Sequence, residues 1–304
     1  MNIIISGGLG HIGSLLVRKL LLSKSIKNLI VIDNISTQRY SSLFNVKNKI
    51  KLTLIEKNVQ EVNLKSILKK NDIFIHLSAI TNAAESFSIK NKIFLNNFES
   101  TKYIADSCSN KNAKLIFISS TSVYGSGDKI MYEDRDDNLK PQSPYAECKI
   151  KEENYIKSLS KKLKFVIFRF GTIVGTSPGM RFHTAVNRFC WQASHNQAVT
   201  VWKYSYTQCR PYLDLSDAIK VFEHFIFKNL FNCQIYNVVT FNKSVKDIID
   251  LIKIYKKKIK INFVKNTIMN QLSYSVSREK IIKTGFVFRG NLKKSIKKII
   301  KILN

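Results

Sequence analysis

A tyrosine and a lysine four residues apart are the pair in this sequence best suited to acid–base chemistry. Tyr145 and Lys149 are separated by Ala-Glu-Cys, and on a helix residues at this spacing share one face. An ammonium group beside a phenol stabilises the phenolate, so we expect Lys149 to lower the pKa of Tyr145 from about 10 toward neutrality. The phenolate could then take a proton from a hydroxyl group while a hydride leaves the same carbon. A solvated helix face is the alternative interpretation of the pair.

Hydroxyl side chains precede this pair at the end of an apolar run. Residues 115–118 are followed by Ser119, Ser120, Thr121 and Ser122. Parallel α/β sheets place their ligands at the carboxyl ends of strands. Serine clusters also cap helices and turns, but this one would supply the hydroxyl of a Ser–Tyr–Lys triad.

A glycine-rich turn lies near the start of the chain. Gly7, Gly10 and Gly13 form G-x-x-G-x-x-G between the apolar run 3–5 and a helical pattern at 12–22. Glycine has no Cβ, so a pyrophosphate can approach the backbone closely. The N–H groups of the following helix then point at the phosphates. A structural glycine turn without a ligand is the alternative.

An acidic residue follows the turn at a suitable distance. Asp33 closes the apolar run 29–32, twenty residues after Gly13. An acid at this place accepts hydrogen bonds from the ribose hydroxyls of adenosine and repels a 2′-phosphate. The two features together predict a dinucleotide site that prefers NAD to NADP.

The elements that position these residues alternate along the first half of the chain. The apolar runs are nearly continuous, as in strands buried on both faces, and helical patterns lie between them. This alternation predicts βαβ units and a parallel sheet. The predicted strands are 3–5, 29–32, 50–55, 73–77, 115–118, 165–170 and 235–239, and the predicted helices include 12–22, 62–68 and 94–108.

Beyond residue 170 the alternation weakens and helices dominate. We expect a dinucleotide-binding domain over 1–170, completed by a returning strand near 233–240, and a smaller, mostly helical substrate-binding region over 171–304. In the final stretch, apolar residues recur at helical spacing with lysines between them. Such a basic amphipathic helix can lie on a membrane, but we expect it to dock its apolar stripe on its own domain. The apolar positions are Leu292, Ile296, Ile299, Ile300 and Leu303.

The composition indicates a folded protein with an unusual charge. The 304 residues are 44% hydrophobic, a fraction that disordered polymers do not reach. Fifty Lys and Arg against 21 Asp and Glu give a net charge of +29, which attracts anions such as nucleotides, nucleic acid or an acidic membrane surface. No nucleic-acid-binding motif accompanies the charge, so we attribute it to compositional drift and expect no specific nucleic-acid partner.

The cysteines and the hydropathy of the sequence indicate the cellular environment of the protein. The five cysteines are widely spread and form no C-x-x-C pair, which predicts reduced, mostly buried thiols and no metal site. No apolar run approaches the roughly 20 residues that a membrane-spanning helix needs, so we expect no membrane insertion. The first residues lack the basic lead of a signal peptide. A cytoplasmic protein is expected.

These motifs in combination resemble the extended short-chain dehydrogenase/reductase family and, within it, the NAD-dependent sugar-nucleotide epimerases and dehydratases. The resemblance covers nearly the whole chain and extends to the segments that begin at His76, Arg169 and Arg210. It implies a Rossmann-type doubly wound parallel sheet, NAD as cofactor and a nucleotide-sugar substrate. It also implies a homodimer formed through the helices around 94–108 and 145–159.

The resemblance implies roles for individual residues. Tyr145 would be the general base, and Lys149 would hold the nicotinamide ribose and tune Tyr145. Ser120, or Thr121 if the loop differs by one residue, would hydrogen-bond the reacting hydroxyl. Cofactor contacts would come from Gly7, Gly10, His11, Ile12, Gly13, Asp33, Asn34, Asn58, Val59, Leu77, Ala79, Asn97 and Lys149. Substrate contacts would come from Thr172, Arg181 and Arg210, the last as a diphosphate clamp, with a surface salt bridge as the alternative for Arg210.

Departures from the family pattern bear on the reaction. Lys57-Asn58 replaces the usual Gly-Asp near the adenine, and no acid follows Thr121 where the dehydratases carry Asp-Glu. The carboxylate of the sugar-acid decarboxylases is missing as well. The leading hypothesis is therefore C4 epimerisation of a nucleotide sugar through a 4-keto intermediate. The resemblance alone implies that the product is a precursor of a cell-surface polysaccharide or lipopolysaccharide. The alternatives are a nucleotide-sugar 4-dehydrogenase or keto-sugar reductase and a non-catalytic NAD-binding regulator, which would usually lack the Tyr–Lys pair.

Overall fold

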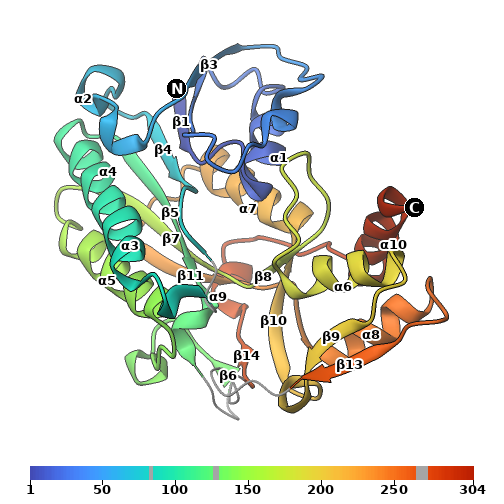
Figure 1. Cartoon of the computed structure of the whole chain (residues 1–304). Coiled ribbons are helices and arrows are strands. Elements are labelled where there is room, and N and C mark those ends of the chain that lie inside the picture. The colour runs from blue at the N-terminus through green and yellow to red at the C-terminus, as the bar shows by residue number, and fades with distance from the viewer. Residues whose placement is uncertain (82–84, 126–129, 265–272) are drawn as a thin grey trace.

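Seven parallel strands form the central sheet, and they lie where the apolar runs predict them. The computed structural model describes residues 1–81, 85–125, 130–264 and 273–304. The strand order is β11-β7-β5-β4-β1-β2-β3 (Figure 1), which confirms the expected Rossmann-type doubly wound topology. The strands are β1 (Asn2–Ser6), β2 (Asn28–Ile32), β3 (Lys51–Ile55), β4 (Ile73–His76), β5 (Lys114–Ser120), β7 (Lys164–Phe170) and β11 (Gln234–Val238).

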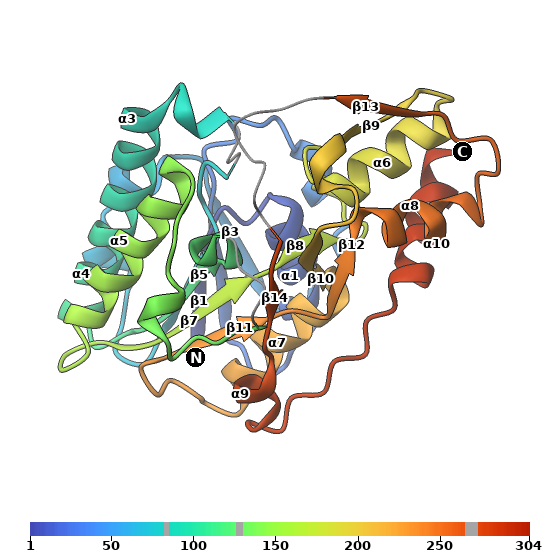
Figure 2. The same ribbon diagram turned by 90° about the horizontal axis from the view of Figure 1, so that it is seen from below.

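Alternate residues of each strand face two helical layers, because successive side chains of a strand point to opposite faces. Ile3 and Ile5 pack toward one layer and Ile4 toward the other, all fully buried. The first layer contains α1 (His11–Leu20) and α7 (Leu215–Phe227), and the second contains α2 (Leu64–Ile67), α4 (Glu99–Asn110) and α5 (Pro144–Ser158). Figure 2 shows α4 and α5 side by side on one side of the sheet.

The starts of two helices set the geometry of the site. Ser143 caps α5 by accepting a hydrogen bond from the Ala146 N–H (3.2 Å), and Pro144 occupies the first turn, where its missing N–H costs nothing. Tyr145 therefore lies in the first turn of α5. The N-cap residue of α1 is Gly10, which has no side chain that could accept a hydrogen bond from the first N–H groups of this helix.

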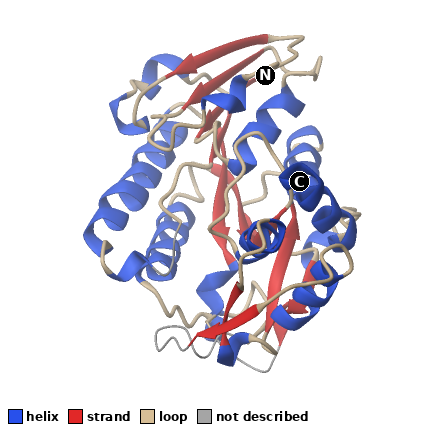
Figure 3. Cartoon of the chain, turned by 45° about the vertical axis from the view of Figure 1, so that its right-hand side comes forward, coloured by secondary structure: helices blue, strands red, loops and turns tan. Residues whose placement is uncertain are grey.

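The C-terminal part combines helices with two small sheets that the hydrophobic pattern did not predict. One sheet has the order β12-β10-β8 and the other pairs β13 with β9. Figure 3 shows strands in red and helices in blue. As expected, α10 buries the apolar stripe of Leu292, Ile296 and Ile299 against its own domain, on α6 and α8. The elements are β8 (Thr172–Val174), α6 (Ala185–Ser194), β9 (Val199–Trp202), β10 (Cys209–Asp214), β12 (Phe241–Ser244), α8 (Val245–Lys253), β13 (Ile261–Val264) and α10 (Leu292–Leu303).

Two segments after residue 170 return to the central sheet. The strand β11 pairs with β7, and α7 packs against α1 in the same hydrophobic core. The division into 1–170 and 171–304 stays a prediction. The packing of α7 on α1 places this helix with the central sheet. The remaining short elements are α3 (Lys90–Ile93), β6 (Ile130–Met131), β14 (Ser275–Val276) and α9 (Glu279–Ile282).

Two further observations concern the whole described chain. All five cysteines are free, and three of them are buried. Within the described ranges, none of the helices combines the length and the apolar character that crossing a bilayer requires.

Candidate active site

The glycine turn leaves no room for side chains at two of its three glycines. Gly7 has φ +73°, and a Cβ there would lie 2.6 Å from the backbone nitrogen of Ser78. A Cβ on Gly13 would lie 2.4 Å from the Gly7 carbonyl oxygen. The N–H groups of the first turn of α1 have no intrahelical partners, and no acidic side chain lies in that turn. The turn is a cradle for an anion.

A loop from the C-terminal part packs directly on this turn. A Cβ on Gly179 would lie 2.3 Å from the Leu9 carbonyl oxygen, and the Gly179 N–H donates to the Ser14 hydroxyl (3.0 Å). His11, the first residue of α1, is buried and its Nδ1 lies 2.7 Å from the Ser177 hydroxyl. The His11 side chain thus joins two parts of the chain, while Ile12 beside it stays partly exposed.

Asp33 lies at the end of β2 in a fixed orientation. Its carboxylate accepts hydrogen bonds from the backbone N–H groups of Leu9 (2.9 Å) and Ile35 (3.0 Å). The side chain of Arg39 approaches the glycine turn, and its Nη1 lies 3.9 Å from the point that a Cβ on Gly10 would occupy. Sequence reasoning missed Arg39, because a loop residue six positions after Asp33 has no periodicity to place it.

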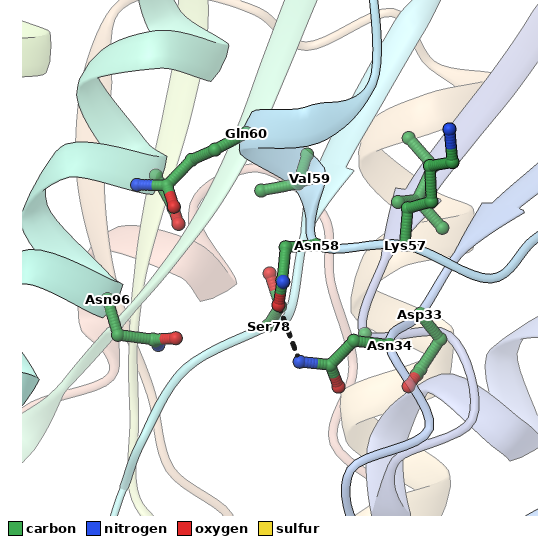
Figure 4. Close-up of a pocket in the computed structure, with 11 residues that line it drawn as sticks. Asp33, Asn34, Lys57, Asn58, Val59, Gln60, Ser78 and Asn96 are labelled. Carbon is green, nitrogen blue, oxygen red and sulfur yellow. Dashed lines mark hydrogen bonds between the residues drawn. The ribbon is translucent and has the colours of Figure 1, made fainter.

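A pocket beside Asp33 brings together several predicted cofactor residues (Figure 4). It is open to solvent, and about 390 Å³ of space lies between its walls, part of it open solvent. The Asn34 amide donates to the Asn58 side-chain oxygen (2.8 Å), as the dashed line shows. The lining residues are Gly7, Ile32, Asp33, Asn34, Lys57, Asn58, Val59, Gln60, Ser78, Asn96 and Ser100.

Asn97 does not line this pocket. Its buried amide accepts from the Ile80 N–H (2.9 Å) and donates to the Ile80 carbonyl (3.0 Å). It therefore holds the segment after β4, in which Leu77 and Ala79 are partly exposed. Its neighbour Asn96 lines the pocket instead, because residues 94–98 form a π-helical turn that shifts the helix face by one residue.

Tyr145 and Lys149 lie on adjacent turns of α5, as their spacing predicts, and both side chains are buried. The Lys149 Nζ is 5.9 Å from the centroid of the Tyr145 ring and 4.6 Å from that of Phe117. It also forms an ion pair of 3.0 Å with Glu152 Oε2. Sequence reasoning missed Glu152, although an acid three residues after Lys149 shares its helix face.

The expected fall in the pKa of Tyr145 is not found. Burial raises the pKa of this phenol, and the charge of Lys149 only partly opposes that effect. Glu152 adds a negative charge that raises the pKa of Tyr145 further, whereas a hydrogen bond with Ser120 lowers it. The prediction was wrong because it counted the ammonium group without its carboxylate partner or the loss of solvent.

The two candidate hydroxyls at the end of β5 point to different partners. The Ser120 hydroxyl lies within hydrogen-bonding reach of the Tyr145 phenol and accepts from the Ser122 N–H (3.1 Å). The Thr121 hydroxyl is buried, donates to the Phe170 carbonyl (3.3 Å) and lies 3.4 Å from the Tyr274 hydroxyl. Ser120, rather than Thr121, adjoins the phenol.

Arg181 and Arg210 lie near the candidate catalytic residues. Neither has a carboxylate partner within ion-pair distance in the described part of the chain. Arg181 donates to the Thr81 hydroxyl (2.9 Å) and to His183 Nδ1 (3.2 Å), and its charge reaches Tyr145. Burial lowers the pKa of Arg181 to about 10. Arg210 extends from β10 beside Tyr274, and burial lowers its pKa too. Arg210 donates to the Gln208 side-chain oxygen (3.4 Å) and forms no salt bridge with the residues that the structure describes.

Thr172 begins β8 and is partly exposed, in register with Tyr212 of β10. It thus lies on the small sheet that carries Arg210. No cluster of three potential metal ligands occurs among the residues that the structure describes.

A network of buried polar side chains lies next to the carboxyl end of β5. Arg169 forms a two-pronged ion pair with Glu153 (2.6 and 2.9 Å) and donates to the Tyr124 hydroxyl (2.9 Å). Tyr124 donates to Asn237 (2.6 Å), whose amide donates to Glu133 (2.9 Å). The network connects β7, β11 and α5 beneath the turn that follows Ser120.

The fold and the site define a dinucleotide-binding α/β protein, and the chain belongs to the NAD dependent epimerase/dehydratase family. The model of that family matches residues 3–238, a span that contains Asp33, Ser120, Tyr145 and Lys149. The resemblance seen in the sequence is thereby confirmed. The glycine cradle and the oriented carboxylate of Asp33 fit NAD, the cofactor of the family.

Particular relatives are similar to this chain over most of its length. A dTDP-D-glucose 4,6-dehydratase of Dictyostelium discoideum is 30% identical over 79% of this chain, which covers 58% of that relative. An uncharacterized UDP-glucose epimerase of Bacillus subtilis is 28% identical over 72% of this chain and 71% of its own length. A UDP-glucuronic acid 4-epimerase from Bacillus cereus, solved with UDP-glucuronic acid and NAD, has a TM-score of 0.90 at 22% identity, covering 100% and 99% of the two chains. The solved structure shows that the fold is shared.

Proposed function

We propose that this protein is a nucleotide-sugar epimerase that inverts C4 by oxidation to a 4-keto sugar and reduction on the opposite face. The supporting observation is the meeting of Ser120, Tyr145 and Lys149 at the carboxyl end of the central sheet. These groups suffice for proton transfer at one hydroxyl, and epimerisation requires no other acid–base pair.

The side chains divide the work of the reaction. Bound NAD would accept the two electrons and the hydrogen of C4 and return them. Tyr145 takes the proton of the C4 hydroxyl and returns it at the end of the cycle. Ser120 donates a hydrogen bond to the same oxygen and orients it. The ammonium group of Lys149 stabilises the phenolate and would hold the nicotinamide ribose, with the predicted glycine-turn and pocket residues holding the rest of the cofactor.

Elimination of water fits the described site less well. The turn after Ser120 carries Thr121 and Ser122 and no carboxylate. The nearby acids are engaged elsewhere, since Glu152 pairs with Lys149 and Glu153 with Arg169. A net dehydrogenase or reductase uses the same three catalytic residues and is the second candidate.

Nuclear magnetic resonance of nucleotide hexoses incubated with the purified protein separates the two candidates. We expect interconversion of C4 epimers without accumulation of reduced cofactor. Stoichiometric build-up of NADH would instead identify a dehydrogenase.

We further propose that Arg181 and Arg210 bind the anionic part of the substrate. Both arginines are half-buried and lack a carboxylate partner within ion-pair distance in the described chain. The charge of Arg181 acts on Tyr145, and Arg210 lies beside Tyr274, whose hydroxyl contacts that of Thr121. A diphosphate matches the geometry of a guanidinium group. Thr172 is proposed as a further substrate contact because it lies beside β10.

The assembly and cellular setting are also proposals. Phe94, Phe98 and Tyr155 are partly exposed next to the adjacent helices α4 and α5 and form an aromatic cluster, which supports a homodimer through these helices. The free thiols agree with a cytoplasmic location. A place in polysaccharide synthesis follows from the family resemblance.

Asp33→Asn should weaken NAD binding and reduce the preference for NAD over NADP. The substitution removes the charge that repels a 2′-phosphate, and Arg39 beside the turn can then attract one. We expect about a tenfold loss in NAD affinity, the effect of one charge-assisted hydrogen bond. Calorimetric titration with both dinucleotides checks it, and an unchanged ratio of the two affinities would contradict the assigned role.

Ser120→Ala and Thr121→Val should differ strongly in their effects on turnover. Removing the Ser120 hydroxyl should lower kcat by about 10²-fold, the effect of losing one oriented donor. Thr121→Val keeps the buried shape and removes a hydroxyl that faces the Phe170 carbonyl, so kcat should change severalfold at most. Steady-state kinetics of both variants decide the matter, and the reverse order would assign the role to Thr121.

A further inference from the structure

Glu152 is a buried carboxylate that the proposed reaction does not use. It lies on α5, is fully buried, and its Oε2 is 3.0 Å from the Lys149 Nζ. It is the one carboxylate within ion-pair distance of Lys149 in the described ranges. An ionised carboxylate out of contact with water needs such a partner and further hydrogen bonds.

A chain of hydrogen bonds fixes the other oxygen of Glu152. The Thr101 hydroxyl of α4 donates to Oε1 (2.6 Å), so Thr101 must accept from His76 Nε2 (3.2 Å). His76 Nδ1 then accepts from the Ser6 hydroxyl (2.7 Å). Burial lowers the pKa of His76 to about 3, so this ring is neutral. The hydroxyl of Ser78, a partly exposed residue that lines the pocket beside Asp33, also lies 3.3 Å from His76 Nδ1. The chain of hydrogen bonds therefore runs from the edge of this pocket to Glu152 and orients its carboxylate.

The charged and titratable groups around Glu152 come from several elements. On α5 they are Lys149, Tyr145 and Cys148, whose thiol has a pKa raised by burial and by Glu152. From β4 comes the neutral His76, and from the loop before α6 comes Arg181, whose charge acts on Tyr145. Among these groups Glu152 supplies the negative charge that balances Lys149.

We propose that Glu152 is a positioning residue that holds Lys149 by an ion pair and thereby sets the pH at which Tyr145 acts as a base. The ion pair fixes the ammonium group next to the phenol in the absence of ligands. Its negative charge also offsets the positive charge felt by the phenol, so Tyr145 keeps its proton until the cationic nicotinamide ring lies beside it. The inference rests on the proposed function, which makes Tyr145 the base.

Titration of the phenolate in the NAD-loaded protein tests this role. The ultraviolet signal of Tyr145 is the part of the tyrosinate absorbance that Tyr145→Phe removes. Glu152→Gln keeps the volume and can still accept from Thr101, and we expect it to shift this signal by about one pH unit to lower pH. Glu147→Gln, an equal change of charge on the exposed face of the same helix, should leave it in place.

Glu152→Asp is the second variant, because it keeps the charge if Glu152→Gln does not fold. We expect the Tyr145 phenolate signal of Glu152→Asp to appear at the same pH as in the wild-type protein. A phenolate signal that stays in place or moves to higher pH in Glu152→Gln would overturn the inference, as would a Glu152→Asp protein that titrates like Glu152→Gln. The titration needs no sugar, so a wild-type protein inactive on every nucleotide sugar would overturn the proposed function independently of this result.

Discussion

Tyr145→Phe should lower kcat by about 10²–10⁴-fold, the usual contribution of a positioned acid–base group. The variant removes one oxygen from a buried ring and leaves the ring volume intact. Ser120 and Lys149 remain, but neither can take the proton of the substrate hydroxyl. Single-turnover and steady-state kinetics with the nucleotide sugar identified by magnetic resonance measure the effect.

The variant should keep its fold and its cofactor. Among the described residues the Tyr145 hydroxyl has Ser120 as its side-chain hydrogen-bonding partner. We therefore expect a stability loss of about 1 kcal/mol and NAD affinity close to that of the wild type. A Tyr145→Phe protein with unchanged turnover would contradict the assigned base. An unchanged biological output in cells would revive the hypothesis of a non-catalytic NAD-binding regulator.

Arg169→Met should produce the largest loss of stability among single substitutions near the site. Arg169 and Glu153 are both buried and joined by two short contacts. Removing the cation leaves the Glu153 charge in a medium of low polarity, which costs about 3–5 kcal/mol. The melting temperature should fall by about 5–8 °C for a chain of this size, measured by circular dichroism without ligands.

The double variant Arg169→Met/Glu153→Leu is the matched control. It removes both charges, and replacing a buried ion pair by apolar residues is often close to neutral. We expect it to recover much of the lost stability, although Tyr124 then loses a donor. If Arg169→Met alone melts within a degree or two of the wild type, the pair contributes little, and the polar network under β5 does not hold the turn after Ser120.

The sequence predicts the inner strands of the central sheet well because they are buried on both faces. The run 3–5 and its inner counterparts are apolar at successive positions and too short for a helix, whereas the edge strand β3 alternates apolar and polar residues and is partly exposed. The steric demand at Gly13 is local, since its Cβ would meet the backbone of Gly7 and Gly8, whereas the demand at Gly7 comes from the distant backbone of Ser78. The short strands β12 and β13 of the C-terminal part are partly exposed, and their pattern is too short to distinguish from that of a loop.

The site was predicted less completely because its chemistry depends on contacts between elements. The Tyr145–Lys149 spacing is visible along one helix, whereas the ion pair of Lys149 with Glu152 needs the burial that only packing of α4 and α5 supplies. Asn96 replaces Asn97 in the pocket because a π-helical turn changes the helix register. The expected acidity of Tyr145 failed for the same reason, since desolvation cannot be read from spacing.

The contact of Gly179 with the glycine turn couples two processes that are usually treated separately. With backbone packed on backbone, the turn cannot widen unless the segment carrying Ser177 and Gly179 withdraws. That segment continues to Arg181, a proposed ligand of the sugar nucleotide. We therefore expect escape of a bound dinucleotide to require movement of the segment that carries Arg181, so that a sugar nucleotide held by Arg181 would also retain the cofactor.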